Sequence, residues 1–198
     1  MAPVPLSRRQ LLRGFAAAPL LWLLRPSVAL ALGGTLPTVG EPSPDFQLAA
    51  VIPDGKGGAT DTERSLADFA GQWLVLYFYP RDFTSGCTLE ARGFQRDLEA
   101  FRARGAAVAG ISADDGESHQ SFCGSEGLAF PLLSDPDGAV SRRYGSWMAP
   151  YSQRHTFLVD PQGVLRQVWT AVRPAGHSAE VLAALDQLQS ADADSSGP

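Results

Sequence analysis

The chain contains 198 residues, which is enough for one well-buried domain and too few for two of ordinary size. Hydrophobic residues make up 44% of the chain and charged residues 19%, a composition typical of a folded globular protein. The net charge is -5 and Lys56 is the single lysine, so the chain lacks the clustered basic surface that nucleic-acid binding requires. We therefore expect no nucleic-acid partner.

The first 31 residues have the pattern of an export signal. Two adjacent arginines, Arg8 and Arg9, precede an apolar run of about a dozen residues at 14–24, and small residues follow at 28–31. This pattern resembles a twin-arginine export signal with an A-x-A-like cleavage site. A bilayer span needs roughly 20 apolar residues, so a cleaved signal peptide fits better than a permanent membrane helix.

Twin-arginine export carries folded proteins, so this interpretation predicts delivery of the finished domain to a periplasm or a thylakoid lumen. The membrane would be contacted only during export. An uncleaved amphipathic anchor is the alternative, because Arg25 stands between the apolar run and the cleavage site.

Composition also indicates the limits of the folded domain. Residues 32–44 are rich in Gly, Pro and Thr and suit an extended lead-in segment. Residues 190–198 are small and polar, and we expect them to form a flexible tail. One domain should therefore occupy about residues 36–189, without internal repeats.

The first half of this domain is predicted to form a strand, a helix, a second strand and a second helix. The unbroken apolar and aromatic run at 73–79 is typical of a central strand buried on both faces. Apolar residues then recur at helical spacing and a glycine follows, which predicts a helix over 87–104. Residues 106–112 indicate another buried strand, and residues 117–126 have helical composition.

The second half is predicted to contain a hairpin and a closing helix. Residues 156–159 and 164–170 are β-rich and flank an Asp-Pro-Gln-Gly turn, and residues 179–188 are amphipathic. This order of elements indicates an α/β sandwich around a central mixed β-sheet flanked by helices. It is compatible with a thioredoxin-like architecture, although periodicity alone does not select that fold.

Cys87 stands where the predicted central strand gives way to a helix. Unpaired backbone N–H groups and the macrodipole at a helix N-terminus favour anions, and such positions lower the pKa of a thiol from about 8.5 towards roughly 3.5 to 7.5. This context predicts a nucleophilic thiolate. With two cysteines in all, no Cys-x-x-Cys pair and no zinc-ligand spacing, the chain has neither a disulfide scaffold nor a cysteine metal site.

The same segment resembles the peroxiredoxin family. Pro80, Thr84 and Cys87 match the family signature P-x-x-x-T-x-x-C at the strand-to-helix position. Residues 130–138 and 154–161 look like the corresponding segments of the bacterioferritin-comigratory, or Q-type, branch. The resemblance covers nearly all of the predicted domain, and it implies a thioredoxin-like sandwich with thiol peroxidase activity.

The resemblance also implies a role for each site residue. Cys87 would attack the terminal oxygen of hydrogen peroxide or a small organic hydroperoxide and become a sulfenic acid. Thr84 would hydrogen-bond the thiolate and the peroxide, Pro80 would shield the pocket from water, and Arg154 would stabilise the thiolate and the developing negative charge. Taken alone, Thr84 would equally fit a helix cap and Arg154 a surface ion pair.

The family further implies what the enzyme needs besides its own side chains. No metal, haem or flavin cofactor is expected, because the sulfur atom itself carries the redox change. The expected reductant is a thioredoxin-like dithiol protein, and relatives of this branch are often monomers.

The sequence departs from many Q-type relatives at the position of the second cysteine. Arg92 stands five residues after Cys87, where such relatives carry a resolving thiol on the same helix. Cys123 lies 36 positions beyond Cys87, where another subgroup of the family carries its resolving thiol. The resemblance therefore implies an intramolecular Cys87–Cys123 disulfide, formed with local unwinding because two helix-borne thiols rarely meet the required geometry. The alternative is a one-cysteine enzyme in which Cys123 packs in the core beside Phe122.

Two further alternatives concern the chemistry. His119 precedes Cys123 by one helical turn, but no other ligands cluster nearby, so we expect a solvated histidine instead of a metal ligand. A thiol–disulfide oxidoreductase of the cell envelope is disfavoured because such proteins use a Cys-x-x-Cys pair. A binding domain that has lost the chemistry is disfavoured by the intact signature positions.

Overall fold

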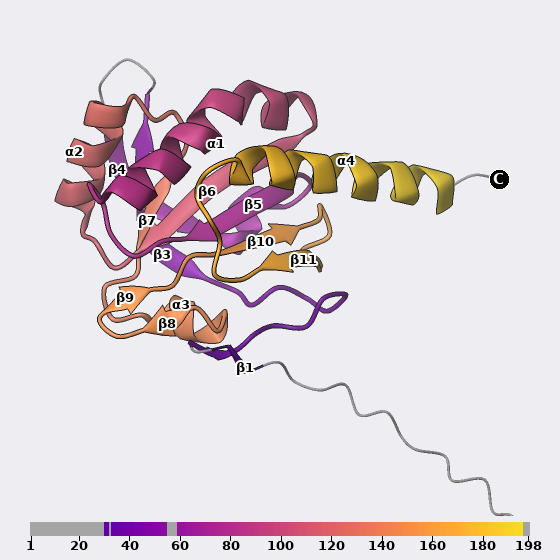
Figure 1. Ribbon diagram of the computed structural model, residues 1–198, viewed down its shortest axis with the longest axis horizontal. Coiled ribbons are helices and arrows are strands. Elements are labelled where there is room, and N and C mark those ends of the chain that lie inside the picture. The colour runs from indigo at the N-terminus through magenta and orange to yellow at the C-terminus, as the bar shows by residue number, and fades with distance from the viewer. Residues whose placement is uncertain (1–29, 32, 55–58, 196–198) are drawn as a thin grey trace, which may run out of the picture.

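The computed structural model describes residues 30–31, 33–54 and 59–195, and the structural statements below concern these residues (Figure 1). The predicted export signal falls outside the described residues except for its last two positions. Those two, Leu30–Ala31 (β1), pair with Gly34–Thr35 (β2) as a short antiparallel ribbon. No helix within the described ranges is long and apolar enough to cross a membrane.

A seven-stranded mixed sheet forms the centre of the molecule, in the order β11-β10-β5-β6-β7-β3-β4. Its three middle strands, β5, β6 and β7, run parallel to one another. On one side β10 pairs antiparallel with β5 and with the edge strand β11, and on the other side β3 pairs antiparallel with β7 and with the edge strand β4. The strands are β3 (Gln47–Pro53), β4 (Ala59–Ser65), β5 (Trp73–Phe78), β6 (Ala106–Ser112), β7 (Leu132–Ser134), β10 (His155–Val159) and β11 (Leu165–Trp169).

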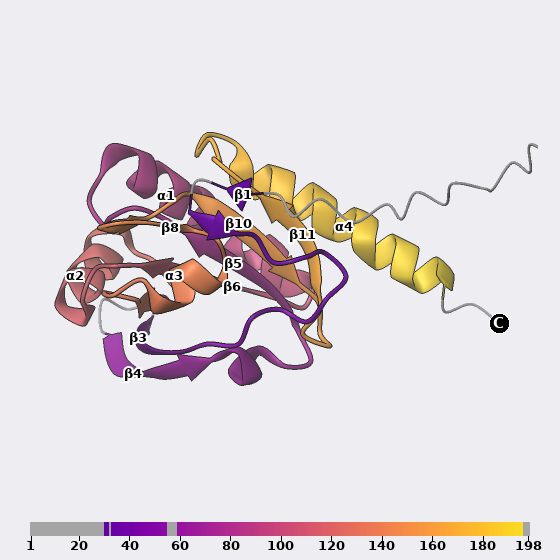
Figure 2. The same ribbon diagram turned by 90° about the horizontal axis from the view of Figure 1, so that it is seen from below.

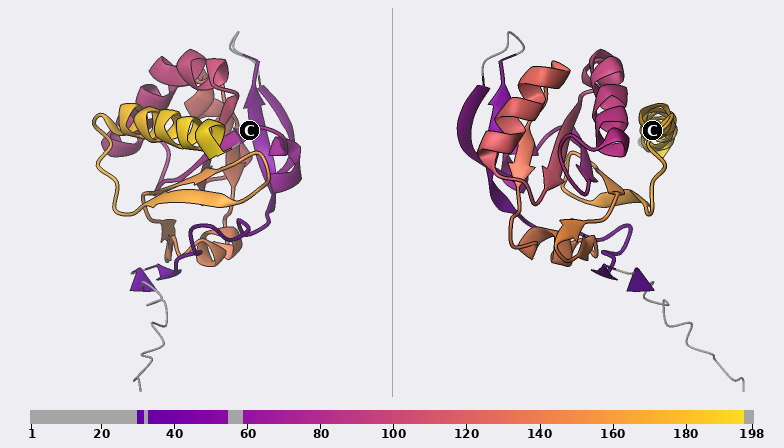
Figure 3. Two further views of the ribbon diagram at one scale, coloured as in Figure 1. Left: turned by 90° about the vertical axis from the view of Figure 1, so that its right-hand side faces the viewer. Right: turned by 60° about the vertical axis from the view of Figure 1, so that its left-hand side comes forward.

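Helices cover both faces of this sheet. The long helices lie together on one face, and the short ones lie on the other with the lead-in segment and a small β-ribbon (Figure 3). The first group is α1 (Ser85–Ala103), α2 (Gly116–Glu126) and α4 (His177–Ser195), and the second is η1 (Leu66–Phe69) and α3 (Ala139–Arg143) with β8 (Trp147–Met148) and β9 (Tyr151–Ser152).

Strand β5 is apolar throughout because it contributes to two cores. Val75 and Tyr77 pack with Phe94 and the other apolar residues under the long helices. The alternate residues, including Leu76, pack against the opposite core, which contains Tyr144. Since side chains of a strand point alternately to the two faces, an unbroken apolar run is what a doubly covered strand requires.

The predicted elements agree with the structure at most positions. The two strands and two helices predicted between residues 73 and 126 are confirmed, and so are the hairpin and the closing helix. Helix α1 begins two residues earlier than expected. Strands β3 and β4 were not predicted, and among the predicted elements the largest difference lies at the C-terminus, where α4 continues through residue 195 instead of giving way to a tail at 190 (Figure 2). Alanines at 191 and 193 favour a helix in the last turns, and Arg166 on β11 forms an ion pair with Asp192.

Candidate active site

Cys87 lies in the first turn of α1, directly after the loop that follows β5. Its side chain is buried, with 1% exposed, in the core beneath the long helices. Thr84 occupies the N-cap position in extended conformation, so Ser85, Gly86 and Cys87 form the start of the helix, whose backbone N–H groups have no partners within the helix. The local sequence therefore places a buried sulfur at the positive end of a helix.

Arg154 reaches this sulfur from the other half of the chain. It directly precedes β10, which pairs antiparallel with β5 so that His155 lies opposite Phe78 at the end of β5. The Arg154 Nη2 donates to Cys87 Sγ at 3.2 Å. Pairing of two strands far apart in the sequence thus brings together two of the predicted site residues.

Gly86 leaves room for this approach. A Cβ at position 86 would lie 3.2 Å from Nη2 of Arg154. At that separation the guanidinium would have to shift by a few tenths of an ångström to make room for a Cβ. The absence of a side chain before Cys87 keeps Arg154 in place.

Glu90 is a site residue that the sequence analysis did not identify. It lies one helical turn after Cys87, its side chain is fully buried, and Oε2 accepts a hydrogen bond and ion pair from Arg154 Nη1. Burial raises the pKa of Glu90 to about 7, against the opposing influence of Arg154. Its spacing of i+3 from Cys87 on the same helix was the available signal.

The guanidinium of Arg154 therefore contacts the Cys87 sulfur and the Glu90 carboxyl group at once. Burial acts against its charge, but Glu90 and Cys87 outweigh burial and raise the pKa of Arg154. A planar guanidinium offers several donors in a fixed geometry, so one side chain can contact the sulfur and the carboxylate together. Such an arrangement orients positive charge on a nucleophilic thiolate.

Thr84 and Pro80 lie in the segment between β5 and α1, and the predicted shielding role of Pro80 stays a prediction. The Thr84 hydroxyl is exposed and donates to the Arg81 carbonyl at 3.0 Å, and no hydrogen bond between Thr84 and Cys87 occurs in the described part of the chain. Pro80 is half-buried just after β5. Because the Thr84 hydroxyl can still accept a hydrogen bond, its role towards a peroxide stays a prediction.

Cys123 lies on α2 and is not joined to Cys87. Both cysteines are free and buried. Burial, with a smaller contribution from the negative charge of Asp82, raises the pKa of the Cys123 thiol to about 12. Cys123 belongs to the large core beneath the long helices that also contains Cys87, but the two cysteines lie far apart in it.

The expectation that His119 is solvated is wrong. Its side chain is fully buried, and Nδ1 lies 2.9 Å from Oδ2 of Asp82, which is itself buried. Sequence spacing placed His119 on a helix but gave no sign that the loop after β5 would present a carboxylate to it. Within the described residues there is no group of three or more His, Cys, Asp and Glu side chains that could hold a metal ion.

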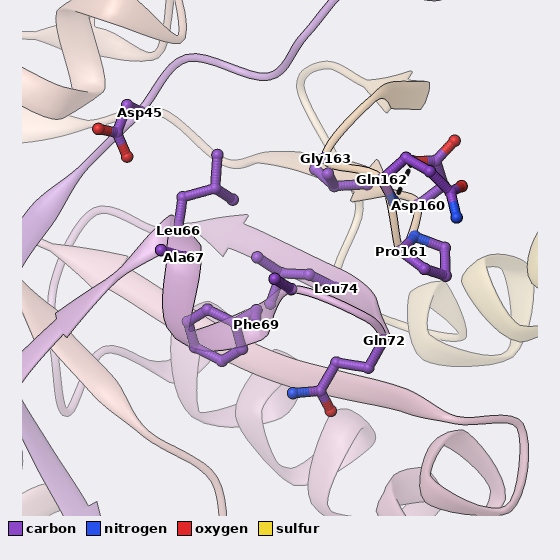
Figure 4. A pocket seen from close by; sticks show the side chains of 12 residues that line it. Asp45, Leu66, Ala67, Phe69, Gln72, Leu74, Asp160, Pro161, Gln162 and Gly163 are labelled. Carbon is purple, nitrogen blue, oxygen red and sulfur yellow. Dashed lines mark hydrogen bonds between the residues drawn. The ribbon is translucent and has the colours of Figure 1, made fainter.

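An apolar cavity of about 260 Å³ lies elsewhere in the molecule. Leu66 and Phe69 of η1, Leu74 of β5 and the turn at 160–163 line it, as Figure 4 shows. Leu74 belongs to the first half of β5, whereas Cys87 follows the end of that strand. The cavity is therefore separate from the thiol site.

Comparison with known proteins decides what kind of thiol site this is. A model of the AhpC/TSA family matches residues 39–168. The chain belongs to the AhpC/TSA family. It is 43% identical over 143 residues to Peroxiredoxin Bcp of Xanthomonas campestris. The matched region covers 68% of this chain and 88% of that relative.

Solved structures give the same result. PrxQ of Xylella fastidiosa is 31% identical, with a TM-score of 0.71 over 79% of this chain and 99% of that chain. A bacterioferritin comigratory protein of Xanthomonas campestris, studied for its alkyl peroxide reduction activity, is 38% identical with a TM-score of 0.64 over 72% and 90%. These likenesses confirm the predicted thioredoxin-like fold and the Bcp/PrxQ branch of this peroxiredoxin.

Proposed function

We infer that this peroxiredoxin is a thiol peroxidase that reduces hydrogen peroxide and small organic hydroperoxides through Cys87. The observation that carries this conclusion is the contact between Arg154 and the buried Cys87 sulfur at the start of α1, in a chain of the AhpC/TSA family. The alkyl peroxide reduction activity of the Xanthomonas campestris relative supports the substrate class.

The first step follows from the geometry of the site. The Cys87 thiolate attacks the terminal oxygen of the peroxide, the S–O bond forms, and the O–O bond breaks. The departing oxygen takes a proton and leaves as water or an alcohol. Arg154 faces the sulfur and stabilises the negative charge that passes from sulfur to the leaving oxygen, while Glu90 keeps the guanidinium in position.

A peroxide-consumption assay with a dithiol reductant tests this function. Cys87→Ser is expected to abolish turnover, because a hydroxyl at this position is far less nucleophilic than a thiolate. Arg92→Ala is a suitable control, since Arg92 is on the same helix, exposed, and paired with Glu126 and not with the site. Turnover retained by Cys87→Ser would refute the assignment.

For the second step, we propose that Cys123 resolves the Cys87 sulfenic acid to give an intramolecular disulfide. The thiol of Cys123 would attack the sulfur of the sulfenic acid, the S–S bond would form, and the S–O bond would break with release of water. The two cysteines lie far apart in the reduced protein, so this step needs a conformational change, and its support is the presence of a second free cysteine on α2. The raised pKa of Cys123 and its burial require α2 to open locally before attack.

Mass spectrometry after one equivalent of peroxide distinguishes the two forms of the mechanism. A cross-link between Cys87 and Cys123 is the expected product. A persistent Cys87 sulfenic acid would instead identify a one-cysteine peroxiredoxin resolved by an external thiol. Recycling by a thioredoxin-like dithiol protein is the companion proposal, tested by adding a purified thioredoxin system and following peroxide loss.

We also propose that the folded enzyme is exported by its twin-arginine-like signal and acts as a monomer in a periplasm or thylakoid lumen. The arginine pair and the short apolar run carry the export proposal. N-terminal sequencing of the mature protein tests it, and a start before about residue 28 would contradict cleavage. Analytical ultracentrifugation of the reduced protein tests the monomer.

A further inference from the structure

A buried polar cluster joins the loop before Cys87 to the helix that carries Cys123. Its centre is Asp82, five residues before Cys87, whose side chain is 1% exposed. One carboxylate oxygen lies 2.9 Å from Nδ1 of His119 and accepts the Ser118 hydroxyl at 2.8 Å, and the other accepts the Tyr79 hydroxyl at 2.8 Å. The peroxidase step described above uses none of these groups.

The contact to α2 is specific and fully desolvated. His119 has no exposed surface, and its Nε2 has no hydrogen-bond partner in the described part of the chain. The imidazole therefore depends for polar contact on the side facing Asp82, where Tyr79 also lies 3.5 Å away. If α2 moved away while Asp82 stayed buried, the carboxylate would lose a partner that compensates its desolvation, so the contact favours a docked α2.

A second contact beside this pair connects the same two segments. Phe83 adopts a positive φ of 59° and places its ring against Phe122, with 5.2 Å between ring centres. Phe122 directly precedes Cys123. The loop residue Asp82 thus contacts α2 one helical turn before Cys123, and Phe83 contacts the residue next to Cys123.

We propose that the Asp82–His119 pair sets the rate at which Cys123 reaches the oxidised Cys87. Asp82 and His119 are positioning residues: they hold α2 folded while Cys87 reacts with peroxide, and their separation is the slow event before the disulfide forms. This inference rests on the proposed resolving role of Cys123. The inference further implies that the Cys87 sulfenic acid persists until Asp82 and His119 separate. During this interval a second peroxide molecule can oxidise it to sulfinic acid.

The test separates the two chemical steps in the full-length reduced enzyme. Rapid quenching with thiol alkylation and mass spectrometry gives the rate of Cys87 sulfenic acid formation and the rate of disulfide formation. His119→Leu removes the polar contact, and His119→Asn keeps a donor near the position of Nδ1. Ser118→Ala is a milder variant that removes one hydrogen bond to Asp82 from the helix surface.

The expected result is a change in the second step alone. Disulfide formation should accelerate about tenfold or more in His119→Leu and about two- to threefold in Ser118→Ala, and it should stay close to the wild-type rate in His119→Asn. Sulfenic acid formation should stay within about twofold of wild type in each. Less Cys87 sulfinic acid should accumulate in His119→Leu at excess peroxide.

Two controls exclude a general loss of stability. Ser125→Ala removes a hydroxyl on the same helix that bonds only within α2, to the Phe122 carbonyl. Tyr144→Phe removes a buried hydroxyl that donates to the Pro44 carbonyl on the opposite face of the sheet. Neither variant should accelerate disulfide formation, even if Tyr144→Phe lowers the melting temperature as much as His119→Leu does.

Each negative result has its own meaning. If the wild-type enzyme cross-links and both His119→Leu and Ser118→Ala do so at the wild-type rate, the proposed role of the pair is overturned while the resolving role of Cys123 stands. If the wild-type enzyme gives only a persistent sulfenic acid, the resolving role fails first, and the inference fails with it. Should His119→Leu not fold, Ser118→Ala against Ser125→Ala decides.

Discussion

Glu90→Gln should change how the stability of the reduced protein depends on pH. Glu90 is buried, and its pKa in the folded protein is raised from the usual 4.5 to about 7, chiefly by burial. A carboxyl group whose pKa rises on folding stabilises the fold fully below its unfolded pKa and loses that contribution as pH increases through the folded pKa. Ionised Glu90 therefore lowers the free energy of unfolding above neutral pH.

The size of the effect follows from the displacement of the pKa. Each unit corresponds to about 1.4 kcal/mol, so the full cost of Glu90 is about 3 kcal/mol, of which about 2 kcal/mol develops between pH 5 and pH 8. Gln cannot ionise, and its carbonyl oxygen can still accept from Arg154. The amide nitrogen of Gln would take the place of Glu90 Oε1, which has no hydrogen-bond partner within the described residues, and this costs stability at every pH. The signal to follow is therefore the slope of unfolding free energy against pH, not its absolute value.

Urea unfolding at pH 5, 6, 7 and 8 under reducing conditions measures this difference. The wild-type profile alone is insufficient, because burial lowers the pKa of His155 to about 4, and that histidine makes the fold more stable as pH rises from about 4 to 6.5. Subtracting the Glu90→Gln profile removes the contribution of His155. Glu99→Gln, at a position 82% exposed on the same helix, is the control. Parallel profiles for wild type and Glu90→Gln would refute the argument.

Three other substitutions test the contacts of the site and the core. Arg154→Lys should slow the reaction with peroxide about 100-fold in stopped flow, because one ammonium cannot contact Cys87 and Glu90 as the guanidinium does; a rate near wild type would contradict the role of Arg154. Gly86→Ala should slow the same reaction about tenfold through the contact of its Cβ with Arg154, with little change in melting temperature. Tyr144→Phe should cost about 1–2 kcal/mol of unfolding free energy by urea titration, and an unchanged midpoint would show that its bonds to Ser43 and Pro44 contribute nothing.

The elements that the sequence predicts well are those with a local pattern. The run at 73–79 is apolar throughout, and the strand at 106–112 is apolar up to its last residue, Ser112, because both lie in the middle of a doubly covered sheet. The helix after Cys87 repeats its apolar residues every three or four positions. In contrast, the short strand at 132–134 and the edge strand at 59–65, which is largely exposed, have no such pattern and are defined by their neighbours.

The site shows the same division between local and non-local information. The position of Cys87 at a strand-to-helix junction could be predicted from the sequence alone, whereas the place of Arg154 came from the resemblance to a family. Glu90 and the Asp82–His119 contact escaped prediction because burial of a charged residue depends on what packs against it. An acidic residue on a helix is normally expected to face water, and only tertiary structure shows the partner that compensates it.

The buried charges that escaped prediction are also the ones that carry function. Glu90 lowers stability above neutral pH. It also binds Nη1 of Arg154 and so keeps Nη2 of the same guanidinium in contact with the Cys87 sulfur. An apolar residue at position 90 would remove the cost of a buried carboxylate and leave the guanidinium free to turn away from Cys87. A site that orients charge on a thiolate therefore retains a local loss of stability, and the two fully covered cores on either side of β5 offset it.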